Sequence, residues 1–484
     1  MGIVIKHSAW NLGITAIGFV LGAANTLLLA TKYLSDDYYG LWGYVLSSAF
    51  LLFPLMSFGI HNTVVKFYSS YKSKAQKDAF LTQMLVLPLL IILPVVTVIY
   101  FFEFKIIELI TRVNTMVGAY VWHIILIGIF HAYFEIFYAW VKVQMKTIGG
   151  NLIKEVFYRF SATLLLILVW QEMISQKQFI DALVLVYILR CCFMMILAFK
   201  TYLPRFRIDS ASFNKQIFTY SFLMLIAGSV GTLLIDLDKY MINQYLEIET
   251  ISYYGVAVYI ATVIAIPARG MSQITHPLTA GYLNSGALDK MEDLYKRSSL
   301  NLSIVSGFLM VVILCNVQEF YKLLPPEFAV AIPIVFIISL VKFAENLSGS
   351  NNAILYNSNL YKVTLWLGLG LAVLAIVLNL ILIPKYGLIG AGISTCVAFI
   401  CYAGAKIAYV HLKLKVHPWT PQTWKSIAVI VVTITIFVFW DFNYNVIVNI
   451  ALKTLMLSVF YLFAVYKLEL SKEINTILKK YTGL

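Results

Sequence analysis

Long apolar runs, separated by short polar breaks, follow one another along the chain from Ser8 to Val465. Each run is about 20 residues long, which is the length that a helix needs to cross the hydrocarbon core of a bilayer. Because that core offers no water to unpaired backbone groups, each run predicts a transmembrane helix. The pattern therefore predicts an all-α polytopic membrane protein with about 14 transmembrane helices. The expected spans are 8–30, 40–62, 80–101, 117–139, 152–170, 178–200, 215–236, 252–275, 298–317, 329–352, 360–382, 388–410, 423–440 and 444–466.

The composition excludes most other classes of protein. Hydrophobic residues make up 61% and charged residues 12% of the 484 residues, whereas soluble domains carry about 25% charged residues. No stretch outside the spans exceeds about 30 residues, which is too short to bury a core of its own. The five cysteines lie in or beside apolar runs and lack the spacing of metal ligands, so they are expected to pack as small apolar side chains. We therefore expect no soluble catalytic domain, no metal and no other cofactor.

Positive charges set the expected orientation of the spans. Most of the 36 Lys and Arg residues fall before the first span, in the loops after even-numbered spans, or in the C-terminal tail. Such loops stay in the cytoplasm, so both termini are expected there. The formal charge of +13 then describes one membrane face. Since no compact basic module exists, nucleic-acid binding is not expected.

Two similar segments indicate an internal repeat. Residues 38–45 open the second expected span and residues 253–260 open the eighth, and both begin with Tyr-Tyr-Gly. A repeat of six spans keeps its orientation in the membrane, which is typical of transporters with two lobes and a substrate site between them. We therefore expect an N-terminal lobe at 1–214, a C-terminal lobe at 215–415, and two appended spans with a cytoplasmic tail at 416–484. The lobes would alternate access to the site by rocking.

Charged side chains within the spans are the main functional signal. Each costs about 2.5–3.5 kcal/mol at the centre of a helix in lipid, so they are expected to face the bundle interior or a wet cavity. Arg190 lies near the expected midplane without an acidic neighbour in its span, which makes it the best anion-binding candidate; structural pairing between helices is the alternative. Glu135 and Arg159 are expected to pair, although Glu155, four residues before Arg159, is another partner.

Three sets of residues are assigned to a cavity between the lobes. Polar stripes at helical spacing on spans 1 and 10 would supply hydroxyl and amide groups, although the Gly18–Gly22 spacing on span 1 also fits close helix packing. The cationic candidates are Arg190, Arg159, Lys342, Lys239, Arg269 and Lys66, the last two being alternatively interface anchors. The polar wall candidates are Asn11, Thr15, Asn25, Ser339 and Asn346. Candidates for proton or sodium coupling are Glu135, Asp236, Asp238 and Glu345, for which partnered structural roles are the alternative.

An enzymatic alternative is weaker. The segment Asp236–Lys239 contains an Asp-x-Asp pattern, and acidic pairs at a membrane surface can hold a metal and a sugar donor. The outer loops expected near 102–116 and 237–251 are about 15 residues each, too short to build a folded site of their own. We therefore expect a transporter rather than an enzyme.

Segments spread along nearly the whole chain resemble a known family. They are Tyr33-Leu34, Tyr39-Gly40-Leu41 and Phe58-Gly59; Asp238–Ile242, Tyr254-Gly255-Val256 and Tyr259; and Asn379–Gly392. In this order and spacing they resemble the bacterial polysaccharide-biosynthesis flippases, the O-antigen and oligosaccharide-lipid translocases of the multidrug/oligosaccharidyl-lipid/polysaccharide exporter superfamily.

The resemblance implies a substrate. Such proteins move an undecaprenyl-pyrophosphate-linked oligosaccharide from the cytoplasmic to the periplasmic leaflet of the bacterial inner membrane, here as a monomer, in concert with a glycan polymerase. Guanidinium groups suit the pyrophosphate, but the cations assigned above follow from their depth and not from a family motif. Two alternatives stay open: a flippase for the peptidoglycan lipid precursor, and a cation-coupled multidrug antiporter of the same superfamily.

Overall fold

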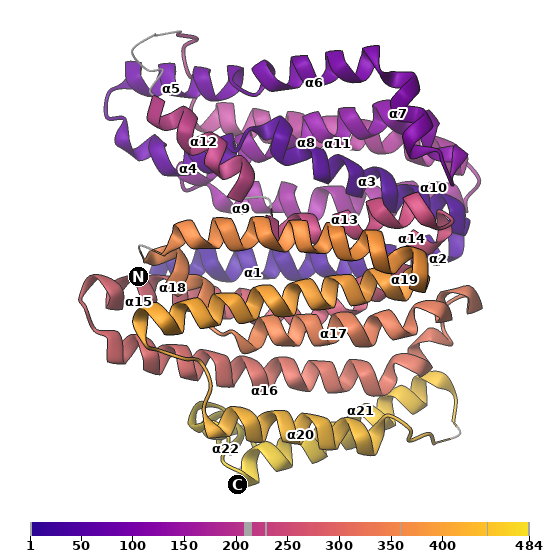
Figure 1. Ribbon diagram of the computed structural model, residues 1–484, viewed down its shortest axis with the longest axis vertical. Coiled ribbons are helices and arrows are strands. Elements are labelled where there is room, and N and C mark those ends of the chain that lie inside the picture. Colours follow the sequence, from indigo (N-terminus) through magenta and orange to yellow (C-terminus); the bar gives the residue numbers. More distant parts are fainter. Residues whose placement is uncertain (1, 208–214, 228–229, 359, 443, 483–484) are drawn as a thin grey trace. The chain divides into compact units, whose positions relative to one another are not determined.

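The chain forms helices throughout the part that the structure describes. A computed structural model describes residues 2–207, 215–227, 230–358, 360–442 and 444–482, and no strand occurs within them. Contacts divide the chain into unit 1, Met1–Ser252, and unit 2, Tyr253–Leu484, whose helices are labelled in Figure 1. Unit 1 contains α1 (Gly2–Ala23), η1 (Ala24–Leu29), α2 (Ala30–Tyr33), α3 (Asp36–Ser57), α4 (Ile60–Phe67), η2 (Tyr68–Ser70), α5 (Lys74–Val86), α6 (Leu89–Phe101), α7 (Glu103–Ile110), η3 (Thr115–Tyr120), α8 (Val121–Val143), α9 (Thr147–Leu152), η4 (Ile153–Phe157), α10 (Tyr158–Trp170), α11 (Gln176–Thr201), α12 (Lys215–Ala227) and α13 (Val230–Tyr245).

The unit boundary falls within α14 (Glu249–Thr262). Unit 2 continues with η6 (Val263–Ala265), α15 (Ile266–Asn284), α16 (Leu288–Tyr321), η7 (Pro326–Ala331), α17 (Ile332–Leu347), α18 (Asn351–Asn357), α19 (Tyr361–Leu414), α20 (Pro421–Phe437), α21 (Val446–Lys467) and α22 (Lys472–Thr482). Two of the short segments, η1 and η4, are π-helical, and the other η segments are 3-10 turns.

Side chains just before several helices determine where those helices begin. Ser73 before α5 and Ser175 before α11 each form a capping box with the glutamine three residues later. Thr420 caps α20, where Pro421 occupies the first turn. These caps supply acceptors for N–H groups that have no partner within the helix, and proline at that position loses no hydrogen bond.

Ten helical segments are long and apolar enough to cross a membrane, and α20 is a shorter apolar helix. The predicted class, an all-α polytopic membrane protein, is therefore confirmed. Helix is present in each of the expected span ranges, but the total of about 14 spans stays a prediction. The ten segments are Gly13–Tyr33, Asp36–Ser57, Lys74–Phe101, Thr115–Val143, Gln176–Thr201, Glu249–Asn284, Leu288–Tyr321, Pro326–Leu347, Val363–Leu414 and Val446–Lys467.

The long element α19 is a hairpin of two helices. Its Gly387 has φ 56° and ψ −135°, which is not helical, and glycine tolerates positive φ because it has no Cβ. Ser394 Oγ donates to the carbonyl oxygen of Ala375 at 3.1 Å. In a straight helix these residues would be about 28 Å apart, so the second arm folds back on the first, as the expected break between 382 and 388 predicts.

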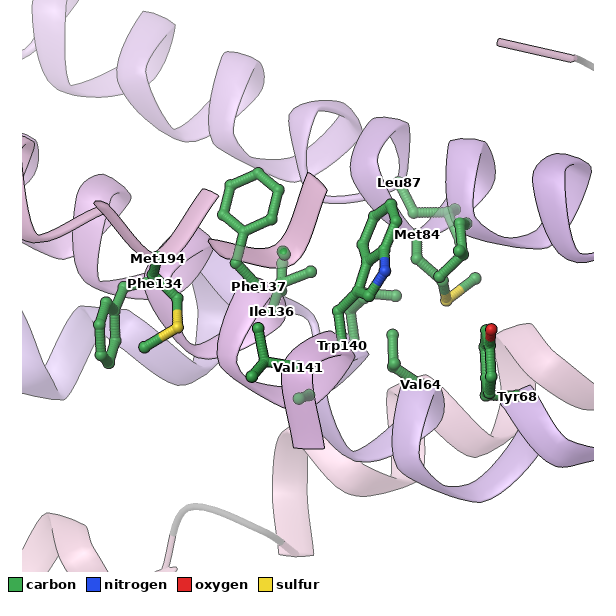
Figure 2. Packing of buried hydrophobic residues seen from close by; sticks show 14 of the residues in the cluster. Val64, Tyr68, Met84, Leu87, Phe134, Ile136, Phe137, Trp140, Val141 and Met194 are labelled. Carbon is green, nitrogen blue, oxygen red and sulfur yellow. The ribbon is translucent and has the colours of Figure 1, made fainter. Parts of the chain in front are cut away.

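Packing in unit 1 is centred on α8, which contacts α3, α4 and α11. Figure 2 shows the buried cluster at one end of these helices, where Phe134 and Trp140 of α8 lie with Met194 of α11, Val64 of α4 and Met84 of α5. Each of these side chains is essentially inaccessible to solvent. Because lipid tails are as apolar as these residues, close van der Waals contact rather than the hydrophobic effect stabilises such a cluster in a membrane.

Helices α12 and α13 pack within unit 1. Ser221 of α12 and Thr63 of α4 share a hydrogen bond of 2.7 Å between their hydroxyl groups. The rings of Tyr44 on α3 and Tyr240 on α13 are stacked with centroids 6.1 Å apart. The helices of expected span 7, α12 and the start of α13, therefore contact helices of unit 1. The lobes expected at 1–214, 215–415 and 416–484 stay a prediction.

Unit 2 is organised around α16, which contacts α15, α17, α20 and α21. Polar contacts attach the C-terminal helices to it. Ser303 and Ser426 share a hydrogen bond of 2.6 Å, and Lys453 of α21 donates to the carbonyl oxygen of Cys315 at 3.1 Å. Lys453 is 4% exposed, so a charge that the sequence placed within a span is enclosed between helices.

Candidate functional site

A two-point ion pair joins α8 to η4 in unit 1. Lys154 Nζ donates to both carboxylate oxygens of Glu135, at 2.8 and 3.0 Å, and the Glu135 side chain is 14% exposed. The expected pair between Glu135 and Arg159 is wrong. Arg159 instead pairs at 2.9 Å with Glu155, one turn earlier, which was the alternative partner. The π-helical turn η4 carries both Lys154 and Glu155.

Arg190 of α11 lies beside this pair without an acidic partner of its own. It is 6% exposed, and Nη2 donates to the carbonyl oxygen of Lys154 at 3.0 Å. Its Cζ lies 3.9 Å from the ring centroid of Phe134 and 5.7 Å from that of Tyr187. The Nε has no hydrogen-bond partner, and no carboxylate in the described part of the chain forms an ion pair with this guanidinium. A buried guanidinium of this kind has unused capacity to bind an anion.

Aromatic side chains surround this cluster. Tyr187 contacts Tyr158 with ring centroids 5.2 Å apart, and Trp42 donates to the Tyr158 hydroxyl at 2.9 Å. The ring of His131 lies 4.8 Å from that of Phe50. Glu135, Lys154 and Arg190, with the rings next to them, are called cluster 1 below. The charged groups and the rings around them come from five helical segments, α3, α8, η4, α10 and α11.

The polar stripe of span 1 packs against the neighbouring span. Asn11 Nδ2 donates to Thr147 Oγ1 at 3.2 Å, and Asn25 Nδ2 donates to the carbonyl oxygen of Arg159 at 2.7 Å. The hydroxyl of Thr15 bonds within its own helix at 2.9 Å. The amide groups of Asn11 and Asn25 thus donate between helices, but Asn11 Oδ1 has no hydrogen-bond partner. The role of the stripe in a cavity wall stays a prediction.

A second group of charges lies in unit 2. Lys342 Nζ of α17 pairs with Glu345 at 3.4 Å, and the side chains of these two residues are 11% and 42% exposed. Lys406 on the second arm of α19 donates to Asn352 Oδ1 at 3.0 Å, and its Nζ lies 4.2 Å from the ring centroid of Tyr402. Lys342, Glu345, Asn352, Tyr402 and Lys406 are called cluster 2 below.

The span 10 stripe is buried next to cluster 2. Asn346 Nδ2 donates to the carbonyl oxygen of Ile264 at 2.7 Å, while its Oδ1 has no hydrogen-bond partner. Ser339 is fully buried, and its Oγ likewise has no partner. Unsatisfied buried acceptors and hydroxyls are costly in a folded protein, so these groups mark a part of unit 2 that is not optimised for packing alone.

The remaining candidates lie on α4, α13 and α15, and Asp236 of α13 acts electrostatically on Tyr187 of cluster 1. Lys66 is exposed on α4, with Nζ 3.9 Å from the centroid of a tyrosine ring on α12. Arg269 is exposed on α15, Asp238 is fully buried on α13, and Asp236 lies on the same helix near Lys239. In the described part of the chain, no group of three His, Cys, Asp or Glu side chains is arranged to hold a metal ion. The binding and coupling roles of these residues stay predictions.

Sequence reasoning did not single out Lys154 or Lys406, although it placed Asn352 on the polar stripe of span 10. Both lysines lie near expected span ends and were counted with the cytoplasmic charges. A signal was present for Lys406, because Tyr402 precedes it by four residues and an aromatic ring at that spacing can cover an ammonium group on the same helix face. Their partners are distant in sequence, so only the folded structure shows which carboxylate or amide each one meets.

Comparisons with known proteins agree with this architecture. A family model described as "Polysaccharide biosynthesis protein" matches residues 4–277, and no curated protein matches in sequence. The lipid II flippase MurJ in an inward closed conformation has a similar structure, with TM-score 0.68 and 18% identity over 96% of this chain and 99% of that one. An inward-facing MATE multidrug transporter has a TM-score of 0.62 and 12% identity over 84% of this chain and 98% of that one. A MOP-superfamily transporter from Pyrococcus furiosus has a TM-score of 0.57 and 13% identity over 85% of this chain and 95% of that one. At these identities the similarity concerns the fold.

Proposed function

The chain belongs to the polysaccharide biosynthesis protein family, and we propose that it is a flippase for an oligosaccharide linked to undecaprenyl pyrophosphate, such as an O-antigen, capsule or exopolysaccharide repeat unit. The observation that carries the proposal is the unpaired guanidinium of Arg190. Both carboxylate oxygens of Glu135 are bonded to Lys154, so Arg190 interacts with this carboxylate only through space and forms no ion pair with it. A pyrophosphate is the anion that a planar guanidinium binds well in a site with little water.

The direction of transport follows from the proposed topology. With both termini in the cytoplasm of a bacterial inner membrane, the glycan would load from the cytoplasmic leaflet and leave toward the periplasm, where a polymerase would use it. Sugar hydroxyl groups need amide and hydroxyl partners, which Asn and Ser side chains of the spans would supply. Coupling to a proton or sodium gradient is assigned to the carboxylates Glu135, Asp236, Asp238 and Glu345.

The test is complementation of a bacterial strain that lacks its own flippase. The wild-type chain should restore surface glycan, and mass spectrometry of the lipid fraction should show that the lipid-linked intermediate no longer accumulates. Arg190→Ala should abolish export at wild-type protein abundance, whereas Arg190→Lys should keep part of it. Arg205→Ala removes an exposed arginine beyond the end of the same helix and should export normally. Normal export by Arg190→Ala would overturn the assignment.

A second candidate is a flippase for the peptidoglycan lipid precursor. The observation that favours it is the structural similarity to MurJ over 96% of this chain. The two candidates predict different intermediates in the complementation strain. Rescue of cells depleted of their peptidoglycan-precursor flippase, with disappearance of an accumulated peptide-bearing lipid, would support the second candidate over the first.

A further inference from the structure

Clusters 1 and 2 have the same charge composition. In cluster 1, the carboxylate of Glu135 on α8 pairs with one cation, and Arg190 on α11 is a second cation without an acidic partner. In cluster 2, Glu345 on α17 pairs with one cation, and Lys406 on α19 is the second. If the chain repeats after six spans, α17 corresponds to α8 and the second arm of α19 corresponds to α11. Each unit then has its surplus cation on the sixth span of its repeat.

Lys406 is more deeply buried than a surface lysine would be. It is 5% exposed, its hydrogen-bond acceptor is the neutral carboxamide of Asn352 at 3.0 Å, and the Tyr402 ring covers its ammonium group. The acidic group that acts on it electrostatically is Glu345, which already pairs with Lys342. Two ammonium groups therefore share one carboxylate, and cluster 2 carries a surplus positive charge.

A surplus buried cation is costly in a membrane-spanning helix, and an anion that completes the pairing removes part of that cost. Cluster 2 is not enclosed on all sides, because the Glu345 side chain is 42% exposed. Lys453 provides a contrast. It is equally buried but is enclosed between α16 and α21, where its contact is the Cys315 carbonyl. Lys453 therefore attaches one helix to another, whereas Lys406 borders an accessible polar group.

We propose that Lys406, Lys342 and the amide of Asn352 form an oxyanion subsite in unit 2 that binds a second acidic group of the transported molecule. The oxyanion is either a phosphate of the lipid carrier or the carboxylate of an acidic sugar, since both offer two oxygens to ammonium and amide donors. This subsite rests on the proposed function for its substrate class, but its binding chemistry can be measured without transport.

The test is calorimetric titration of the purified full chain in detergent with two probes, inorganic pyrophosphate and glucuronate. For the probe that the subsite recognises, Lys406→Gln should raise Kd by about tenfold to a hundredfold, the usual effect of losing a hydrogen bond to a charged group. Lys406→Arg should retain most of the affinity. The probe whose Kd changes identifies the source of the oxyanion.

Lys413→Gln is the matched control. Lys413 lies on the same arm of α19 and also sits over a tyrosine four residues earlier, with Nζ 6.0 Å from the Tyr409 centroid, but it is exposed. The Lys413→Gln variant should bind both probes as the wild type does. Lys406→Met distinguishes a binding role from a structural one, because it removes a surplus buried charge. Its Tm without probe should equal or exceed the wild-type value, and the rise in Tm that the recognised probe causes should disappear.

Parallel titration of Arg190→Gln separates this inference from the proposed function. If Arg190→Gln loses pyrophosphate binding while Lys406→Gln binds both probes as the wild type does, the subsite in unit 2 is wrong and the flippase proposal stands. If Lys406→Gln alone loses binding, the subsite stands and the assignment of Arg190 fails. Failure of the wild type to bind either probe would overturn the subsite.

Discussion

At the residue scale, the pair between Glu135 and Lys154 shows how charge is stabilised inside unit 1. Both carboxylate oxygens are used, and the two side chains are 14% and 31% exposed. Glu135→Gln would leave the partly buried Lys154 without its counter-charge. Breaking a buried pair from one side costs about 3–5 kcal/mol, and partial exposure lowers this, so we expect a loss of about 2 kcal/mol in the free energy of unfolding. A lower Tm of the purified protein in detergent would show it.

The double variant Glu135→Gln, Lys154→Gln is the control for that prediction. It removes both charges and leaves a neutral pair that can still share a hydrogen bond, so it should recover much of the Tm lost by Glu135→Gln alone. A double variant as unstable as the single one would mean that Glu135 stabilises unit 1 through contacts other than Lys154.

The sequence located the important charges better than it located their partners. The cost of charge in lipid singled out five residues: Glu135, Arg159, Arg190, Lys342 and Glu345. Glu135, Arg190 and Lys342 are largely buried, whereas the side chains of Arg159 and Glu345 are 32% and 42% exposed. The predicted partner of Glu135, Arg159, was wrong because depth along a helix does not specify which face of the helix meets the neighbouring span. Lys154 follows Glu135 by 19 residues, beyond a tight turn and within the π-helical segment η4, and neither feature has a periodicity that can be read from the chain.

At the element scale, one glycine permits the close approach of a helix and a loop. A Cβ added to Gly40 of α3 would lie 2.0 Å from the carbonyl oxygen of Ile248, whereas one added to Gly43 would lie 3.0 Å from the Cγ2 methyl group of Ile251. Backbone yields less easily than a side chain. We expect Gly40→Ala to destabilise the protein by about 1–3 kcal/mol and Gly43→Ala to stay within about 1 kcal/mol of wild type because alanine favours helix. Thermal unfolding in detergent measures both.

The helices themselves were largely predictable because their pattern is strong. Apolar runs of about 20 residues have few stable alternatives in a bilayer, where backbone groups must pair within the helix. The interruptions were less predictable. The bend at Phe58 and Gly59, both with positive φ, ends α3 and starts α4 within one expected span. The π-helical turns η1 and η4 also lie inside expected spans, and both contact neighbouring helices that are distant in sequence.

At the scale of the whole molecule, α19 tests the number and direction of the spans. Each arm of this hairpin is longer than the about 20 residues needed to cross a bilayer, and Gly387 separates them. The predicted topology places the turn outside and both ends of the hairpin in the cytoplasm. In a variant without the native cysteines, Lys385→Cys lies at the exposed turn and Lys413→Cys near the exposed end of the second arm.

A membrane-impermeant maleimide added to spheroplasts should label Lys385→Cys, and it should label Lys413→Cys only after lysis. If only Lys413→Cys were labelled in intact spheroplasts, both arms would still cross the membrane, but in the opposite orientation to the predicted one. That orientation would contradict the distribution of positive charge. Labelling of both positions from the same side would mean that the second arm does not cross. The hairpin would then be re-entrant, which is tolerated only where such a segment is enclosed by protein or lines a water-filled cavity, and the predicted number of spans would fall.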